Sequence, residues 1–410
     1  MSIYTDAQEI IHSALEACLP DQAVRRALEG KEFGSGRIFL VALGKAAWQM
    51  AHCAAELLGP RLERGVVVTK HGHSQGDIPR CQVFEGGHPV PDEGSFQGTR
   101  AAMELVQDLE PQDTVVLLVS GGGSALFESP LIPAEELAQL TSALLACGAD
   151  IVEMNTLRKR LSAVKGGRFA QLCAPAQVYS IVLSDILGDP LDMIASGPAY
   201  PDRSTCAQAR AIAEKYQLPL SDQARALLDQ ETPKELDNVE TIITGSVREL
   251  CSAAAAVCQR LGYETHILTD QLCCQAREAG SFLASIARTH GQEGRSLAFL
   301  AGGETVVLLT GKGLGGRNQE LALSAAEGIS GMENALIFSL GSDGTDGPTD
   351  AAGGIVDGQT QGRLTQAGLT IHQVLADNDA YHALEKVDGL IRTGPTGTNV
   401  NDVAVVLLKG

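Results

Sequence analysis

Runs of uninterrupted apolar residues alternate with longer amphipathic stretches along the first half of the chain. The segments "RIFLVALG" at 37–44 and "DTVVLLVS" at 113–120 are apolar at nearly every inner position, as in strands that are buried on both faces. Between them, "SFQGTRAAMELVQDL" at 95–109 has the spacing of an amphipathic helix. Buried strands separated by helices predict a parallel sheet covered by helices on both faces.

A second alternating block follows a polar, mostly helical stretch at 201–240 that resembles a connector. In this block we expect buried strands within "SLAFLAGG" (296–303), "ETVVLLT" (304–310), "NALIFSLG" (334–341) and "DVAVVLLKG" (402–410).

These two blocks predict an α/β protein with two Rossmann-like domains, each built on a mostly parallel sheet. We place the boundary near residue 236, so that 1–236 form an N-terminal domain and 237–410 a C-terminal α/β domain.

The first 20 residues predict an amphipathic helix, with Thr5 and Gln8 spaced as a capping box. They lack the basic start and the small-residue cleavage site of a signal peptide, and no apolar run reaches the length of a membrane span. The ten cysteines are scattered and form no C-x-x-C, which favours buried thiols in a reducing compartment. We therefore expect a cytoplasmic protein.

The composition favours a folded, acidic protein that binds small molecules. With 44% hydrophobic and 20% charged residues the chain has the composition of a globular protein, and its formal net charge is −19. No basic stripe accompanies this charge, which argues against nucleic acid or an anionic membrane as a partner.

Polar residues concentrate where predicted strands end, which is where parallel α/β sheets bind their ligands. Lys45 lies between a strand and a helix, at a position that favours an anion. Three glycines, Gly121 to Gly123, stand between Ser120 and Ser124 and would let the backbone approach a phosphate. A solvated lysine and a tight turn are the plainer interpretations.

Two further segments of the first half carry charge. In "SDILGDPLDM", Asp185 and Asp189 are hard oxygen ligands of the kind Mg²⁺ requires, and one could accept a proton from a hydroxyl nucleophile. In "MNTLRKRLSAVKGGR", the one basic concentration of the chain, Asn155 and the loop-borne Lys165 are the candidates. Helix capping and surface ion pairs are the respective alternatives.

In the second half, residues 311–316 match G-x-G-x-x-G, the dinucleotide fingerprint, which is a weak signal by itself. Asp343, after the next predicted strand, lies roughly where such a site places its ribose acid. The loop "SDGTDGPTDAAGG" that contains it either contacts a ligand or only turns the chain. The sequence has no Walker A motif and no G-x-S-x-G elbow, and His71, His73 and His88 are interpreted as ordinary loop residues.

An ordered set of motifs resembles the class II glycerate 2-kinase family, which carries a MOFRL domain at its C-terminal end. The motifs are "VALGKAA", "GGHPVPDEGS", "SGGGSAL", "VKGGR", "SDILGDPLDMIASGP", "GGRNQELAL", "DGTDGPTDAAG" and "TGPTGTNVNDV". They follow the family order from about Lys45 to Asp402. The resemblance implies a kinase that phosphorylates D-glycerate at its 2-hydroxyl with ATP and Mg²⁺, in a cleft between the two domains.

The resemblance also implies roles for individual residues. Lys45, Arg317 and Asp189 are expected to be catalytic, and Asp185 and Asp189 to bind the metal. Contacts to ATP or glycerate are expected from a larger set that covers both halves of the chain: Ser120, Gly121, Gly122, Gly123, Ser124, Asn155, Lys165, Glu304, Gly315, Gly316, Asp343, Thr398 and Asn399.

Two alternatives to the kinase remain at this point. One is an NAD(P)H-dependent hydroxypyruvate reductase that uses the G-x-G-x-x-G loop, although a hydride-transfer His–acid pair has no obvious place in the sequence. The other is a sensor that binds a sugar acid or a nucleotide without turnover. For the kinase, the expected partners are D-glycerate and ATP, and the sequence leaves a homodimer open.

Overall fold

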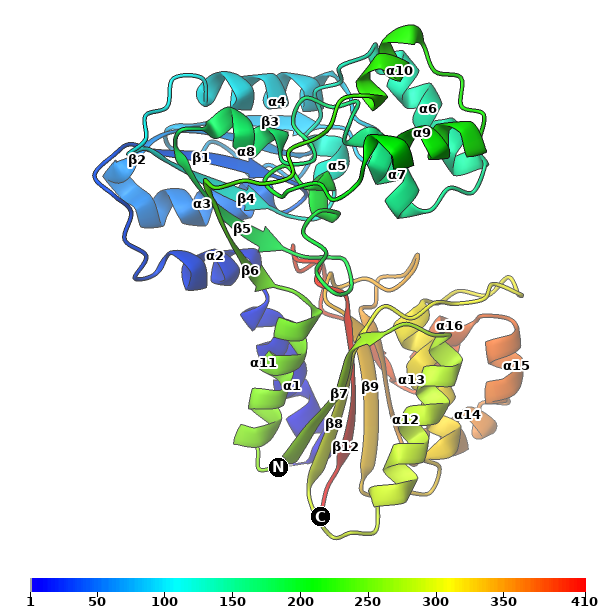
Figure 1. Ribbon diagram of the computed structural model, residues 1–410. Helices are drawn as coiled ribbons and strands as arrows, with labels where there is room; N and C mark the ends of the chain where they lie inside the picture. The colour runs from blue at the N-terminus through cyan, green and yellow to red at the C-terminus, as the bar shows by residue number, and fades with distance from the viewer. Residues whose placement is uncertain (1) are drawn as a thin grey trace. The chain divides into compact units, whose positions relative to one another are not determined.

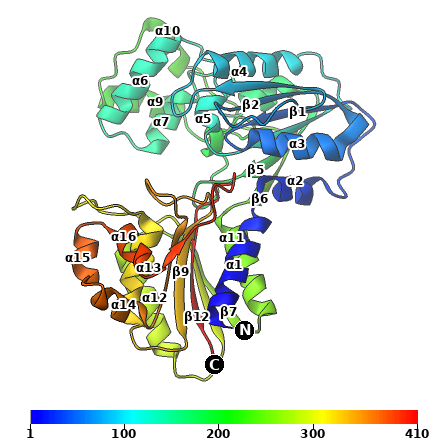
Figure 2. The same ribbon diagram turned by 180° about the vertical axis from the view of Figure 1, so that it is seen from behind.

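The computed structural model describes residues 2–410, which form two compact units. One unit is Ala23–Thr244, and the other combines Met1–Gln22 with Gly245–Gly410. Their helices and strands are drawn in Figure 1 and seen from behind in Figure 2. Within residues 2–410, none of the helices combines the length and the hydropathy that a membrane span requires. The functional assignment of domains 1–236 and 237–410 stays a prediction.

The Ala23–Thr244 unit is built on a parallel sheet with the strand order β3-β2-β1-β4-β5-β6. Its central strand β1 pairs in parallel with β2 on one side and β4 on the other, so the predicted parallel sheet is confirmed in this half. The strands are β1 (Ile38–Leu43), β2 (Leu62–Lys70), β3 (Cys81–Gly86), β4 (Thr114–Val119), β5 (Gln177–Leu183) and β6 (Val239–Gly245).

Helices cover both faces of this sheet, because successive residues of β1 point to opposite sides. The odd-numbered residues Phe39 to Leu43 pack with apolar residues of α4 (Glu93–Leu105) and α8 (Arg168–Cys173). The even-numbered residues Ile38 to Ala42 pack with α2 (Pro20–Leu28) and α3 (Ala47–Leu58). A run that is apolar at every position therefore fits a strand in the middle of three layers.

A group of short helices forms a separate apolar cluster in the same unit. It contains α6 (Ala134–Ala146), α7 (Ile151–Arg158), α9 (Cys206–Lys215) and α10 (Asp222–Leu228). The connector-like stretch 201–240 supplies α9 and α10. Because Ala209 and Leu228 are buried in this cluster, the stretch is part of the unit and not a linker.

The other unit has a mixed sheet, so the expectation of a mostly parallel sheet is wrong here. The strand order is β11-β10-β9-β12-β8-β7. Only β7 and β8 pair in parallel, and the remaining pairs are antiparallel. A fully buried apolar run does not encode strand direction, which depends on the connections. The strands are β7 (Glu264–Leu272), β8 (Leu297–Gly303), β9 (Ala335–Gly341), β10 (Gly353–Asp357), β11 (Leu390–Ile391) and β12 (Asp402–Leu408).

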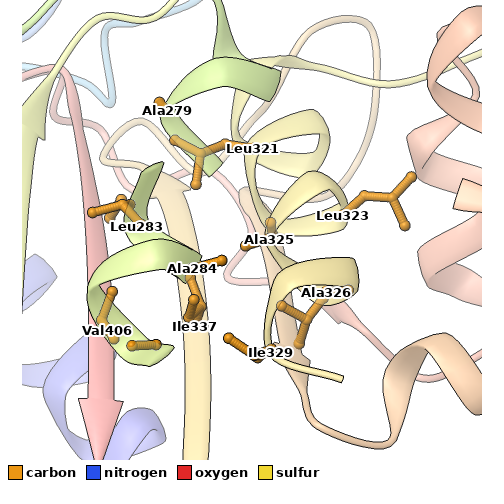
Figure 3. Packing of buried hydrophobic residues seen from close by; sticks show 14 of the residues in the cluster. Ala279, Leu283, Ala284, Leu321, Leu323, Ala325, Ala326, Ile329, Ile337 and Val406 are labelled. Atoms are coloured by element: carbon orange, nitrogen blue, oxygen red, sulfur yellow. The ribbon is translucent and has the colours of Figure 1, made fainter. Parts of the chain in front are cut away.

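One face of the mixed sheet packs against α12 (Ala276–His290) and α13 (Arg317–Gly328), which contribute Leu283, Leu321 and neighbouring alanines to the core drawn in Figure 3. The N-terminal helix α1 (Ile3–Ala17) belongs to this unit too, and it packs against α11 (Val247–Arg260). Asp6 on α1 accepts hydrogen bonds from the Tyr263 hydroxyl at 2.7 Å and from Lys409 Nζ at 2.6 Å.

The predicted N-terminal helix is confirmed, but its predicted cap is wrong. Helix α1 begins three residues earlier than the Thr5–Gln8 capping box requires, and the side chain of Ser2 accepts a hydrogen bond from the Thr5 amide. Thr5 is therefore inside the first turn. Ser2 can act as N-cap because it is extended, with φ −74° and ψ 155°.

The predicted strand "ETVVLLT" is absent. Strand β8 ends at Gly303; after it, Glu304 N–H donates to the carbonyl of Leu272 at the end of β7, and Val306 forms an isolated parallel bridge with Gln275 through its bonds to Cys274 and Ala276. Leu308 and Leu309 are 59% and 78% exposed. The apolar run thus lacks a neighbouring strand, and apolar composition alone cannot supply one.

A matched pair of substitutions on α12 tests this packing. Leu283 is 2% exposed, so we expect Leu283→Ala to lower the free energy of unfolding by about 2–5 kcal/mol. The adjacent Phe282 is 62% exposed, and Phe282→Ala should change that free energy by less than about 0.5 kcal/mol. Urea unfolding followed by circular dichroism measures both, and equal losses would contradict the packing.

Candidate functional site

The loops that follow β1 and β4 are joined at the carboxyl edge of the parallel sheet. The two strands pair up to Leu43 and Val119, so both chains leave the sheet at the same level. Lys45 N–H then donates to the Gly121 carbonyl at 2.9 Å. The Ser120 hydroxyl accepts from the Ala46 amide at 3.1 Å and lies 3.2 Å from the Leu43 carbonyl. The predicted Lys45 and the glycine loop are thus neighbours.

Asp185 reaches the same loop from the end of β5. A Cβ added to Gly121 would lie 2.2 Å from Asp185 Oδ2, so only glycine allows this carboxylate to approach so closely. Asp189 lies in the same segment, with a positive φ of 52°. Its Oδ1 is buried and has no hydrogen-bond partner among residues 2–410. The structure therefore brings Asp185 to the glycine loop and leaves Asp189 with an unused oxygen.

Lys45 and His88 border the glycine loop, and the sequence pattern singles out only Lys45. A Cβ on Gly122 would lie 3.2 Å from Lys45 Cγ and 3.0 Å from His88 Cδ2. Burial lowers the pKa of His88, and the charges of Lys45 and Lys70 lower it further. The interpretation of His88 as an ordinary loop residue misses this contact. The available signal was the motif "GGHPVPDEGS", which contains it.

The amides of the glycine loop are open to a ligand. Among the described residues, the N–H groups of Gly121, Gly122, Gly123 and Ser124 have no hydrogen-bond acceptor. The glycine loop continues directly into the short helix α5 (Gly123–Leu126). Unpaired amides beside a lysine are the arrangement that binds phosphate oxygens.

Lys165 supports this loop from inside the protein. Its Nζ donates to the carbonyls of Ser124 at 2.9 Å and Phe127 at 2.7 Å, and lies 3.2 Å from Glu128 Oε2. Both charged side chains are fully buried. Burial lowers the pKa of Lys165 to about 8, although the charge of Glu128 acts in the opposite direction. Asn155 is buried as well and accepts a hydrogen bond from Ser196 at 2.9 Å.

Arg317 lies in the other unit, at the first position of α13, between two acids. Its Nε and Nη2 donate to the two carboxylate oxygens of Asp402 at 2.5 and 3.0 Å, and its Nη1 donates to Glu304 Oε1 at 2.8 Å. Burial acts against the charge, but these hydrogen bonds and carboxylates raise the pKa of the guanidinium. Glu304, predicted as a ligand contact, is therefore also a partner of Arg317.

The first part of the G-x-G-x-x-G loop is covered by a second loop of the protein. Five successive amides, from Thr310 to Leu314, donate to acceptors in residues 377–379 at 2.8–3.1 Å. Cβ atoms on Gly311 and Gly313 would lie within 2.2–2.6 Å of Asp377 and Asp379. These glycines allow two loops to pack closely, and the five amides from Thr310 to Leu314 are already used within the protein.

The N-terminus of α13 is likewise occupied. Asp346 accepts from the amides of Asn318 at 3.1 Å and Gln319 at 2.8 Å, and so caps the helix. A Cβ on Gly316 would lie 2.3 Å from the carboxylate carbon of Asp346, which explains a glycine here. A Cβ on Gly315, the preceding residue, would lie 3.3 Å from Ala380 Cβ, which is closer than an ordinary van der Waals contact.

The remaining predicted residues lie in two turns at the same edge of the mixed sheet. Asp343 Oδ1 accepts from the Thr345 amide at 3.0 Å, and its carbonyl accepts from the Thr396 amide at 3.2 Å. Thr398 has a buried hydroxyl that lacks a partner within the described chain. Asn399 Oδ1 accepts from the Asn401 amide at 3.4 Å. The roles of all these residues toward a ligand stay predictions.

Carboxylates are present for a divalent cation, but no preformed cage is. Across residues 2–410, no group of three or more His, Cys, Asp or Glu side chains is arranged to hold a metal ion. The unused Oδ1 of Asp189 and the carboxylate of Asp185 beside the glycine loop nevertheless suit a hard cation that also takes ligands from phosphate and water.

The sequence matches two protein families. Residues 6–229 match a domain of unknown function, DUF4147, and residues 297–402 match the MOFRL family.

Three relatives match over nearly their whole length. The chain is 51% identical to D-glycerate 2-kinase of Thermotoga maritima over 98% of this chain and 97% of the relative. It is 40% identical to glycerate 2-kinase of Pyrococcus horikoshii, covering 100% and 98%. A protein of Agrobacterium vitis, provisionally named a hydroxypyruvate reductase, is 39% identical over 91% and 87%. The crystal structure of the T. maritima glycerate kinase has a TM-score of 0.95 over 98% of this chain and 99% of that chain.

Asp346 should make stability depend on pH. Burial raises its pKa to about 7, although the helix amides act in the opposite direction. Because the unfolded chain has the ordinary value of 3.8, the folded state holds this proton more tightly. The protonation of Asp346 therefore adds fully to the free energy of unfolding at pH values below about 4, and this contribution is lost as the pH rises through about 7.

We therefore expect the free energy of unfolding of the wild type, minus that of Asp346→Asn, to fall by about 2 kcal/mol between about pH 5 and about pH 8. The subtraction removes the titration of other groups. Urea unfolding at several pH values measures it, and a difference that stays constant or rises with pH would contradict the raised pKa.

Proposed function

Since the chain belongs to the DUF4147/MOFRL glycerate kinase family, we propose that it transfers the γ-phosphoryl group of ATP to the 2-hydroxyl of D-glycerate. The observation that carries the proposal is the 51% identity to a D-glycerate 2-kinase over 98% of the chain. The open glycine loop beside Lys45 supports it, because phosphoryl transfer depends on positioning and on neutralising charge.

The glycine loop and Lys45 are proposed to bind the phosphates of ATP. The amides from Gly121 to Ser124 provide donors without charge, and Lys45 adds one positive charge at the same edge. In a chain with a formal charge of −19, such local placement is what allows an anionic ligand to bind. Burial and the charges of Lys45 and Lys70 lower the pKa of His88, which favours the neutral imidazole beside the loop.

Asp189 and Asp185 are proposed to hold Mg²⁺, which when bound would neutralise charge on the phosphates. Asp189 is also our candidate to accept the proton of the glycerate hydroxyl. The buried, unpartnered Oδ1 of Asp189 supports either role. The same oxygen cannot bind the cation and accept the proton at once.

Arg317 is proposed to bind the carboxylate of glycerate or a phosphate group. A guanidinium has five N–H donors, and three of them are engaged by Asp402 and Glu304. Within the described chain, two donors therefore remain on the fixed planar group. The two acids hold that plane in place, which reduces the entropy lost when an anion binds.

The reductase alternative has less support. One relative carries that name provisionally, but in the dinucleotide fingerprint that motivated the alternative the amides from Thr310 to Leu314 are used within the protein.

A direct assay separates the two functions. Purified protein is mixed with D-glycerate, ATP and Mg²⁺, and ADP formation is followed through coupling enzymes. A parallel sample contains hydroxypyruvate and NADH or NADPH, and oxidation of the reduced nicotinamide is followed by its ultraviolet absorbance. We expect turnover only in the first sample. Nicotinamide oxidation without ADP formation would replace the kinase by the reductase, and binding without turnover would indicate a sensor.

Arg317→Lys tests whether the two remaining N–H donors of Arg317 bind an anion. A lysine cannot reproduce the paired bonds to Asp402 or present two coplanar donors, so we expect kcat/KM for glycerate to fall about 10²–10³-fold. Lys215→Met, at an exposed ion pair with Glu153, serves as the control and should keep full activity. Circular dichroism checks that the fold is retained. Near-wild-type turnover of Arg317→Lys would contradict the proposed role of Arg317 in binding glycerate or a phosphate.

A further inference from the structure

A strained segment packs against the glycine loop. Ala195, Ser196 and Gly197 have positive φ values of 52°, 60° and 64° in succession. Glycine adopts this conformation freely, but for Ala195 and Ser196 it is unfavourable. Consecutive non-glycine residues persist there only when the surroundings hold them, and such strain concentrates at functional sites.

The surroundings that hold the segment are themselves parts of the candidate site. Gly166 N–H donates to the Ser196 carbonyl at 3.0 Å, and Gly167 N–H donates to the Gly197 carbonyl at 2.7 Å. A Cβ on Gly123 would lie 2.6 Å from Ala195 Cβ. The segment is therefore enclosed between the "KGGR" turn and the glycine loop.

The conformation of Ser196 gives its hydroxyl two partners. Ser196 Oγ donates to Asn155 Oδ1 at 2.9 Å and lies 2.9 Å from Ser124 Oγ. Because a hydroxyl has one proton, Ser196 accepts in the second contact and Ser124 donates. Ser196 is fully buried and Asn155 is 2% exposed, whereas Ser124 is partly exposed. The chain of bonds thus runs from the interior to the surface of the loop.

Ser124 is also fixed at its backbone. Its carbonyl accepts from Lys165 Nζ at 2.9 Å and from Arg158 Nη2 at 3.1 Å. Two cations hold the carbonyl and Ser196 holds the hydroxyl, so the side chain has one orientation. With its proton directed to Ser196, the Ser124 oxygen presents lone pairs, which suit a cation that accompanies the phosphates, whereas its amide, unpaired among the described residues, remains a donor for a phosphate oxygen.

We propose that Ser196 is a positioning residue that acts through Ser124, fixing the Ser124 hydroxyl at the phosphate-facing loop. The left-handed backbone at Ser196 is retained because it aims the hydroxyl at Ser124 and Asn155 together. The proposal rests on the proposed function, since it concerns the same nucleotide site.

A double-mutant cycle tests whether Ser196 acts through Ser124. Ser124→Ala, Ser196→Ala and the double variant are compared with the wild type for kcat and KM in the glycerate kinase assay. We expect Ser124→Ala and Ser196→Ala each to lower kcat by about tenfold, and the double variant to be no worse than Ser124→Ala. Multiplied losses, or full activity of Ser196→Ala, would overturn the proposal.

A second comparison separates positioning from folding. Ser196→Gly and Ser196→Ala both remove the hydroxyl, but only glycine relieves the strain, so Ser196→Gly should have a Tm about 2–4 °C higher. Equal kcat values despite unequal Tm values are expected, and activity that follows Tm would indicate a merely structural role. Gln217→Gly, at an exposed position with φ 49°, is the control and should raise Tm at unchanged activity.

The same cycle is repeated by calorimetry with ATP alone, which needs no turnover. If the wild type fails to phosphorylate glycerate, the proposed function fails, and the positioning proposal is then judged on the Kd for ATP. Coupled losses of affinity in the two single variants support it, and unaltered affinity in Ser196→Ala overturns it.

Discussion

The parallel pairing of β1 with β4 is the constraint on which the candidate site depends. Because the strands end in register at Leu43 and Val119, the two loops leave the sheet at one level and can bond to each other. Lys45 then donates to Gly121, and Asp185 reaches the same glycine from the next strand, β5. Lys45, Gly121 and Asp185 are far apart in sequence, and the sheet brings them together.

The two glycine-rich loops of the chain have opposite uses. In residues 310–316 the glycines admit the backbone of residues 377–379, and every amide from Thr310 to Leu314 is consumed inside the protein. In residues 121–124 the glycines admit Asp185 and leave their amides unpaired among the described residues. A phosphate needs free donors, so the loop with the better-known spacing is the poorer candidate.

An ion pair borders predicted ligand contacts in each of the two units. The pair of Lys165 with Glu128 is fully buried, whereas Arg317, paired with the largely buried Asp402, keeps 31% of its side chain exposed. In each case the charged group contacts a loop that carries predicted ligand contacts. The prediction of Lys165 as a loop-borne contact needs its ammonium at a ligand, whereas the structure shows that ammonium bonded to two carbonyls of the chain.

The sequence by itself determined the apolar strands, the helices between them and the ordered motifs that indicate the family, because burial patterns and local spacing are properties of the chain. Tertiary structure decided the rest. The direction of the strands in the mixed sheet, the exposure of residues 304–310 and the place of α1 beside α11 depend on which segments become neighbours. The same holds for Ser196 and Asp346, whose importance comes from partners 72 and 28 residues away. Hydrogen bonds over such distances follow from packing, and no local pattern encodes them.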